Sequence, residues 1–157
     1  METEARSDWY NRTATEINLY KDTSNKKKSK KYKLELLLGV ANRVDEFSSD
    51  CGECQIFQQE ITTLAQDLGN LIQLPGKERR KSHIKRINNI VKHLKKEHKL
   101  ITEGYYRGMG MMIGPVMGTS IGAAFDNTAV GIAIGVAIGF VIGNYMDKKA
   151  EKEGKVI

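Results

Sequence analysis

Two cysteines separated by two residues, Cys51 and Cys54, are the side chains best suited to chemistry in this 157-residue sequence. Asp50, followed three residues later by Glu53, has the spacing of a capping box and predicts a helix that starts near Cys51. At a helix N-terminus the positive end of the dipole can lower the pKa of a thiol and favour the thiolate. The pair could therefore undergo redox chemistry or supply half of a metal site.

Either chemistry would require partners for the two thiols. A tetrahedral zinc site needs two more ligands, and the histidines are His83, His93 and His98, spaced 10 and 5 residues apart. The sequence has no second C-x-x-C, no β-α-β pattern surrounds the first one, and His98 also falls on an apolar helix seam. We expect both cysteines to pack at a helix junction, with redox switching and metal binding as alternatives, and we expect no cofactor.

Other motifs do not indicate an enzyme. The sequence has no G-x-S-x-G, no phosphate-binding glycine loop after a strand and no H-E-x-x-H. Carboxylate pairs such as Asp45 and Glu46 lie on predicted helix surfaces without an inward-facing pattern. We therefore expect a non-enzymatic protein.

The charges are distributed unevenly along the chain, which has 25 Lys and Arg against 19 Asp and Glu. Between Gly108 and Met146 the only charged residue is Asp126, and this window holds nine of the fifteen glycines. Such a composition excludes two classes of protein: an ordinary soluble enzyme built around a single core, and a wholly disordered chain. The first twenty residues contain no apolar core and so no secretory signal. A basic part that stays in the cytoplasm should precede a membrane part.

Three apolar seams at helical spacing predict an antiparallel, coiled helical bundle over residues 34–104. Before it, residues 1–33 should form a polar arm or one weak helix, whose lysine run at 26–33 is a solvated linker or contacts an anionic partner. No stop signal follows the third helix, so it should continue directly into the membrane segment. The seams are Leu37, Val40, Val44 and Phe47; Phe57, Ile61, Leu64, Leu68 and Leu71; and Ile84, Ile87, Val91, Leu94, His98 and Ile101.

The apolar window predicts a transmembrane helical hairpin over residues 105–147, followed by a charged tail at 148–157. Asp126-Asn127-Thr128 is a good turn sequence between two segments. Each segment has about 18 residues and would form a helix roughly 27 Å long, just enough to cross a bilayer. The fold class expected is thus all-α, with a cytoplasmic antiparallel bundle followed by a two-helix transmembrane hairpin.

The glycines of this hairpin recur every four residues in both segments. Such rows allow close approach of another helix in a membrane, where lipid supplies no hydrophobic drive for association. Ala129, Ala133 and Ala137 form a second small-residue row nearly opposite the glycines, because two residues turn about 200°. One of these two faces could pack against the second helix of the hairpin, and the opposite face could pack against a neighbouring protomer. The glycine rows are Gly110, Gly114, Gly118 and Gly122, and Gly131, Gly135, Gly139 and Gly143.

These rows, the Phe-Asp-Asn turn and the basic tail after Met146 resemble the small bacterial glycine-zipper membrane proteins, over residues 105–157 only. The resemblance implies a membrane-inserted hairpin that oligomerises. It implies no activity, because those proteins have no common established activity. Outer-membrane lipoproteins with glycine zippers carry an export signal that this sequence lacks. We therefore expect the bacterial cytoplasmic (inner) membrane as the location.

The segment from Lys77 to Arg107 is strongly basic, with eleven Lys and Arg against three Glu. Few aromatic residues are interleaved for base stacking, so we expect anionic lipid rather than nucleic acid as its partner. By the positive-inside tendency, this segment and the basic tail place both termini in the cytoplasm. The expected lipid contacts are Lys92, Lys95, Lys96, Lys99 and Arg107.

The sequence favours a membrane-anchored, oligomeric scaffold or interaction protein whose bundle docks an unknown cytoplasmic protein. A pore-forming or membrane-permeabilising effector or small channel is the alternative. A redox or metal sensor that uses Cys51 and Cys54 is a further alternative, compatible with either.

Overall fold

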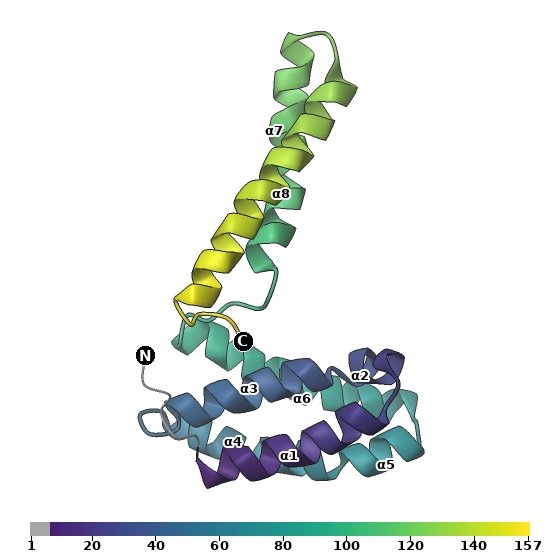
Figure 1. The fold of residues 1–157 in the computed structure, drawn as a ribbon, viewed down its shortest axis with the longest axis vertical. Coiled ribbons are helices and arrows are strands. Elements are labelled where there is room, and N and C mark those ends of the chain that lie inside the picture. The colour runs from purple at the N-terminus through teal and green to yellow at the C-terminus, as the bar shows by residue number, and fades with distance from the viewer. Residues whose placement is uncertain (1–6) are drawn as a thin grey trace. The chain divides into compact units, whose positions relative to one another are not determined.

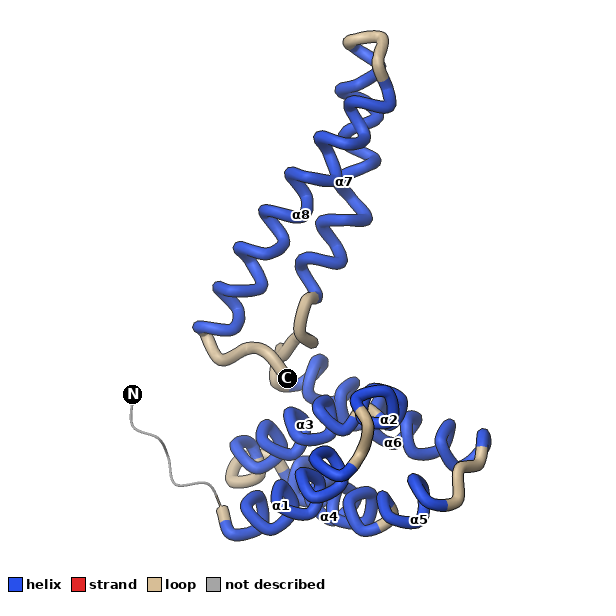
Figure 2. The backbone as a smooth tube through the Cα atoms, turned by 45° about the vertical axis from the view of Figure 1, so that its right-hand side comes forward, coloured by secondary structure: helices blue, strands red, loops and turns tan. Residues whose placement is uncertain are grey.

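The computed structural model describes residues 7–157, and the regular secondary structure of these residues is entirely helical, as expected for an all-α protein (Figures 1 and 2). The chain divides into two compact units, one comprising the residues up to His98 together with Ile157, the other Lys99–Val156. In chain order the helices are α1 (Asp8–Thr23), α2 (Lys26–Tyr32), α3 (Leu34–Phe47), α4 (Gly52–Gln66), α5 (Leu68–Gln73), α6 (Lys77–Glu97), α7 (Tyr105–Ala124) and α8 (Thr128–Lys152).

The first unit is a helical bundle in which α1 packs against α3 and α4, and α3 also contacts α6. Most residues of the predicted seams lie in its core, whereas Phe47, Phe57 and Ile84 are only half-buried. The apolar spacing therefore identified the buried faces of α3, α4 and α6. The fully buried seam residues are Leu37, Val40, Val44, Ile61, Leu64, Leu68, Ile87 and Leu94.

Of the two alternatives for the N-terminal region, a mobile arm or one weak helix, the structure has a helix, α1, which packs in the bundle. The hydroxyl of Ser7 accepts a hydrogen bond from the backbone N–H of Tyr10 and so caps α1. Tyr10, Thr13 and Ile17, spaced by three and four residues, are buried. The indole N–H of Trp9 also donates to Thr62 Oγ1 of α4 at 2.9 Å. A narrow apolar stripe is enough to dock this helix, although most of its residues are polar.

The lysine-rich run is also helical rather than an extended linker. Asn25 caps α2 by accepting from the N–H of Lys27, and Tyr32 at its end is buried. Lys33 then adopts a left-handed conformation with φ 55°, which separates α2 from α3. The lysines at 26–28, 30 and 31 remain exposed.

The helix expected to start near Cys51 is present, because α4 begins at Gly52, but three details of the helix ends differ from the structure. Asp50 does not form a capping box, because Cys51 is the N-cap of α4 and α4 has no side-chain cap. The helical segment that follows Cys51 is divided at Asp67 into α4 and α5. The third helix does not run into the membrane segment, because α6 ends at Glu97. Lys99 follows with a φ of 56°, a left-handed conformation that a helix cannot continue through.

In the second unit, α7 and α8 lie side by side in opposite directions (Figures 1 and 2). Asn127, in the turn between them, caps α8 by accepting from the N–H of Val130. The open end of the pair is also tied together, since the N–H of Ile101 donates to the carbonyl of Lys155 at 2.8 Å. The expected charged tail is thus partly helical, and α8 continues to Lys152.

The docking of α1 can be tested at Ile17, whose exposure is 0%, against Leu19, which is 60% exposed on the same helix. We expect Ile17→Ala to lower the free energy of unfolding by about 2–5 kcal/mol because it leaves a cavity. Leu19→Ala should change it by about 0.5 kcal/mol or less. Trp9, the only tryptophan, provides the fluorescence signal for urea unfolding in mild detergent. Equal effects of the two variants would mean that α1 does not pack in the bundle.

Candidate functional site

The two cysteines lie at the start of α4 in the first unit. Cys51 is the N-cap residue, and its backbone N–H donates to the carbonyl of Phe47 at 2.9 Å, which closes the turn from α3. Cys54 lies nearly one helical turn further on, so both side chains project on the same side of the helix. Cys54 is fully buried and Cys51 half-buried, and both are free thiols.

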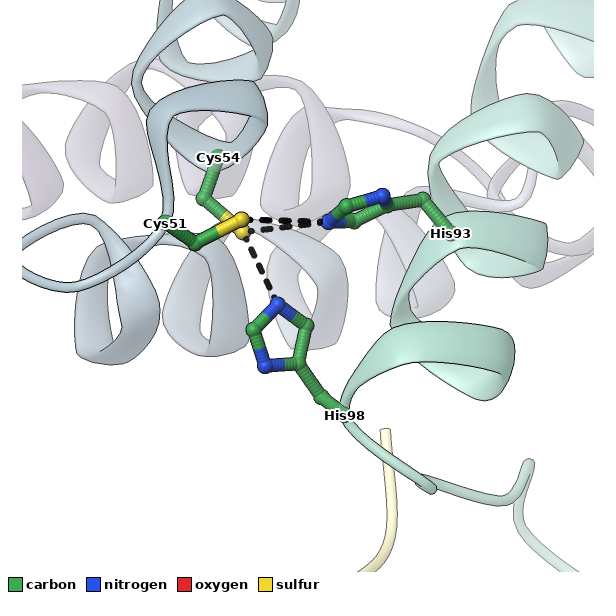
Figure 3. Close-up of side chains that lie close together, drawn as sticks. All are labelled: Cys51, Cys54, His93 and His98. Atoms are coloured by element: carbon green, nitrogen blue, oxygen red, sulfur yellow. Dashed lines mark hydrogen bonds between the residues drawn. The ribbon is translucent and has the colours of Figure 1, made fainter.

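Two histidines from the C-terminal end of α6 approach these thiols (Figure 3). His93 Nε2 lies 3.4 Å from Cys51 Sγ and 3.6 Å from Cys54 Sγ. His98, the C-cap residue of α6, places its Nε2 3.4 Å from Cys54 Sγ. All four potential ligand atoms lie within 4.8 Å of one another. The structure thus unites the C-x-x-C with His93 and His98, neither of which the sequence had assigned to it.

The third histidine has a different environment. His83 is buried, and its Nε2 lies 3.1 Å from the carbonyl of Tyr32, so a neutral imidazole can donate a hydrogen bond there. Burial lowers the pKa of His83, which favours this neutral form. His83 therefore has a structural partner outside the cysteine–histidine cluster.

Neighbouring side chains orient both rings of the cluster. Glu53, between the two cysteines in sequence, places a carboxylate oxygen 2.6 Å from His93 Nδ1. A proton held at Nδ1 leaves the lone pair of Nε2 directed at the sulfurs. Phe47 stacks on His98 with ring centroids 4.0 Å apart, and Phe57 meets His93 edge-on. The imidazoles are therefore held in place from the sides that do not face the thiols.

Burial shifts the pKa of two members of the cluster, Cys54 and His98. It raises the pKa of Cys54 to about 12, and the neighbouring Cys51 adds to the shift. Burial, together with His93, lowers the pKa of His98. Desolvation thus outweighs the lowering of the thiol pKa that a helix N-terminus was expected to give. Because reactive redox cysteines have a lowered pKa, this environment does not favour a redox role for Cys54.

A second candidate site is the interface between α7 and α8. The glycines of the two helices meet in opposite order, Gly110 against Gly139 and Gly114 against Gly135. A methyl group at Gly114 would lie 2.8 Å from the carbonyl carbon of Gly135, and one at Gly139 would lie 2.8 Å from that of Gly110. Any side chain would therefore push the helices apart. Gly118 faces Gly131 in the same way, so the glycine rows pack within one chain.

An acidic residue that the sequence analysis did not single out fixes one end of this interface. Asp147 of α8 accepts from the backbone N–H groups of Tyr106 and Arg107, at 2.9 and 3.0 Å. These N–H groups belong to the first turn of α7, which has no side-chain cap of its own. Asp147 therefore acts as the cap from the neighbouring helix. In the sequence, the position of Asp147 at the charged end of an apolar segment was the only indication of this capping role.

The expected lipid contacts are divided between the two units. Lys92 and Lys96 are exposed on α6 and Lys95 is half-buried there, while Lys99 and Arg107 are exposed in the second unit. Lys96 also pairs with Glu97 at 2.9 Å. Their contact with lipid stays a prediction.

Comparison with known proteins identifies the second unit. Residues 102–149 match the family of glycine zipper membrane proteins, and the N-terminal part matches no family. This match agrees with the resemblance seen in the sequence and points to a membrane-associated segment. No curated protein and no solved structure matches the chain. Among the described residues, α8 alone is long and apolar enough to cross a membrane, and 17% of its apolar window is buried in the protein.

The close approach of α7 and α8 predicts that added bulk at the interface will separate them. Gly135→Leu should lower the stability of the helix pair by about 1–3 kcal/mol, because leucine cannot fit against Gly114. Ala123→Leu, at an exposed position of α7, is the matched control and should change stability by about 0.5 kcal/mol or less. Titration of detergent-solubilised protein with SDS, followed by circular dichroism, measures both. Equal stability of the two variants would contradict the interface.

Proposed function

We propose that the protein is a non-enzymatic scaffold anchored in a membrane by α7 and α8, with the bundle of the first unit available to bind a cytoplasmic protein. The observation that carries the proposal is the large apolar surface that these two helices leave exposed. Monomeric soluble proteins rarely expose contiguous apolar patches of this kind, whereas lipid covers them without cost. Exposed residues include Met112, Val116, Met117, Ile121, Ile134, Ile138, Val141 and Ile142.

Both helices should lie in the bilayer. The apolar composition of α8 supports a crossing, and α7 runs beside it along the glycine interface, so the two share the same depth. With 20 residues, α7 would be about 30 Å long, which equals the usual thickness of the hydrocarbon core. Helices satisfy their own backbone hydrogen bonds, as a lipid environment requires.

A neighbouring copy of the chain is the partner that fits the outer face of α8. The glycine row is used against α7, whereas Ala129, Ala133 and Ala137 are exposed at a spacing of four residues. Small side chains let a second helix approach closely in lipid. We therefore propose that the chain oligomerises through this alanine row and so becomes a multivalent platform for its cytoplasmic partner.

A pore is the alternative arrangement of the same oligomer. The polar side chains available for a water-filled lining are few, chiefly Thr119, Ser120 and Asn144. The Thr119 hydroxyl donates back to the carbonyl of Val116 at 2.7 Å, which removes part of that polarity. This favours the scaffold over the pore.

The charges at the helix ends support an orientation in the bacterial inner membrane. Lysines at 148, 149, 152 and 155 follow the apolar part of α8, and the basic α6 precedes α7. The connecting turn carries only Asp126. By the positive-inside tendency both termini belong in the cytoplasm, where Lys92, Lys95, Lys96, Lys99 and Arg107 can attract anionic lipid.

This orientation can be tested with a single cysteine. Asn127→Cys, in a chain with Cys51→Ala and Cys54→Ala, should react with a membrane-impermeant maleimide in intact cells, because the turn faces outward. The wild-type chain, whose two cysteines lie in the first unit, should not react in intact cells. Labelling of the wild type alone in intact cells would reverse the topology.

The alanine row is tested by Ala133→Leu combined with Ala137→Leu. We expect the crosslinked oligomers seen in native membranes to decrease strongly, because leucine keeps a neighbouring helix at a distance, while insertion stays unchanged. Ala123→Leu is again the control, and its crosslinking ladder should match the wild type. An unchanged ladder in the double variant would contradict the oligomer interface.

The same cells distinguish a scaffold from a pore. Induced expression of the wild type should leave the signal of a membrane-potential dye unchanged. Depolarisation by the wild type that disappears in the variant with Ala133→Leu and Ala137→Leu would instead support the pore.

A further inference from the structure

We propose that Cys51, Cys54, His93 and His98 bind one zinc ion as a closed, four-coordinate site. The four residues come from two segments of the first unit, the start of α4 and the end of α6. The inference rests on the geometry of this cluster and does not depend on the membrane scaffold proposed above.

The distances between the side chains match those of zinc ligands. Zinc bonds of about 2.3 Å to sulfur and about 2.0 Å to nitrogen, at tetrahedral angles, separate a sulfur ligand from a nitrogen ligand by about 3.5 Å. Three of the four sulfur–nitrogen distances in the cluster are 3.4, 3.6 and 3.4 Å, and all four ligand atoms lie within 4.8 Å of one another. The rings and sulfurs point toward a common centre (Figure 3). An ion could therefore be accepted with only small side-chain movements.

Hydrogen bonds account for two of the three close contacts, since the Cys51 thiol can donate to His93 Nε2 and the Cys54 thiol to His98 Nε2. They leave the 3.6 Å contact between Cys54 Sγ and His93 Nε2 without a proton. His93 Nε2 lies near both sulfurs, yet a neutral imidazole with its proton at Nδ1 has one lone pair at Nε2 and can accept one thiol proton. Cys54 Sγ likewise lies near two ring nitrogens but has one proton to donate. A central cation would satisfy every one of these atoms at once.

The surroundings have the features of a structural zinc site. Ligating histidines usually donate their second ring nitrogen to a carboxylate, which fixes the ring and strengthens it as a ligand, and Glu53 occupies that position beside His93. The His93 side chain is only 8% exposed and Cys54 is fully buried. Four protein ligands leave no open position for substrate, which is the pattern of structural rather than catalytic zinc.

The chemistry of the donors selects the metal. Two thiolates with two imidazoles in tetrahedral arrangement favour zinc, whereas magnesium and calcium require oxygen ligands. Binding would release the two thiol protons. The resulting zinc–dithiolate–diimidazole centre carries no net charge, so it is compatible with the buried position of Cys54.

The site would join two parts of the bundle that are distant in sequence. Cys54 and His93 are 39 residues apart, and a metal cross-link between them reduces the freedom of the unfolded chain. His98 directly precedes Lys99, the first residue of the second unit. The ion would thus hold the end of α6 on the α3–α4 turn and fix the point where the chain leaves the bundle.

The test uses the full chain, purified in mild detergent under reducing conditions and reconstituted with zinc or cobalt. We expect one zinc per chain by elemental analysis after dialysis. Cobalt should give the thiolate charge-transfer band and the visible bands of a tetrahedral site. A wild-type chain that retains neither metal would overturn the proposal.

Variants of the ligands provide the controls. Cys54→Ser and His98→Gln should each lose stoichiometric zinc and the tetrahedral cobalt spectrum, whereas His83→Gln, which changes the histidine outside the cluster, should retain both. Glu53→Gln should keep the spectrum but weaken zinc affinity by about 10–100-fold. Zinc should raise the thermal unfolding midpoint of the wild type and leave those of Cys54→Ser and His98→Gln unchanged. Equal metal content in wild type and ligand variants would overturn the proposal even if the variants were less stable.

Discussion

The contact between the backbones of α7 and α8 is the interaction on which the second unit depends. Lipid does not drive two apolar helices together, so their association depends on dispersion contacts at short range and on the order of the surrounding lipid. Glycines every four residues make that range accessible, because a methyl group at Gly114 would already meet the backbone of Gly135. The cap that Asp147 supplies to α7 then fixes the register at the polar end. The same packing leaves the larger apolar side chains facing outward, which is the surface a membrane would cover.

The first unit follows a different physical rule, since burial from water forms its core. Its helices are amphipathic, and the apolar stripes of α3, α4 and α6 meet with the narrow stripe of α1. At the turn from α3 to α4 this core includes Cys54, and the end of α6 brings two imidazoles against it. Burial keeps the thiol protonated in the absence of a cation, because a buried thiolate without a partner would be costly. A redox function would need the opposite environment, so the cluster is better suited to metal ligation.

The two units differ in their surface and in their chemistry. Residues 102–149 match glycine zipper membrane proteins, and the bilayer attachment proposed above belongs to this unit. The bundle, which matches no known family, contains the chemically distinctive groups. The cysteine–histidine cluster lies at the end of α6, where the chain leaves the bundle.

The sequence by itself determined the helical class, the buried faces of the main helices and the phase of the glycines, because all three depend on local periodicity. The spacing of Leu37, Val40 and Val44 specifies a helix face wherever the helix packs, and the uncharged window indicates a membrane segment without any knowledge of the fold. Only the tertiary structure decided that α1 packs in the bundle, since its short stripe is stable only against α3 and α4. It also decided that α6 ends before the second unit. Lys99 adopts a left-handed conformation there, and a lysine in the sequence gives no indication of that conformation. The convergence of Cys51 and Cys54 with His93 and His98 likewise required the fold. Their spacing in sequence matches no local motif, and the antiparallel return of α6 is what brings the nitrogen atoms to the sulfur atoms.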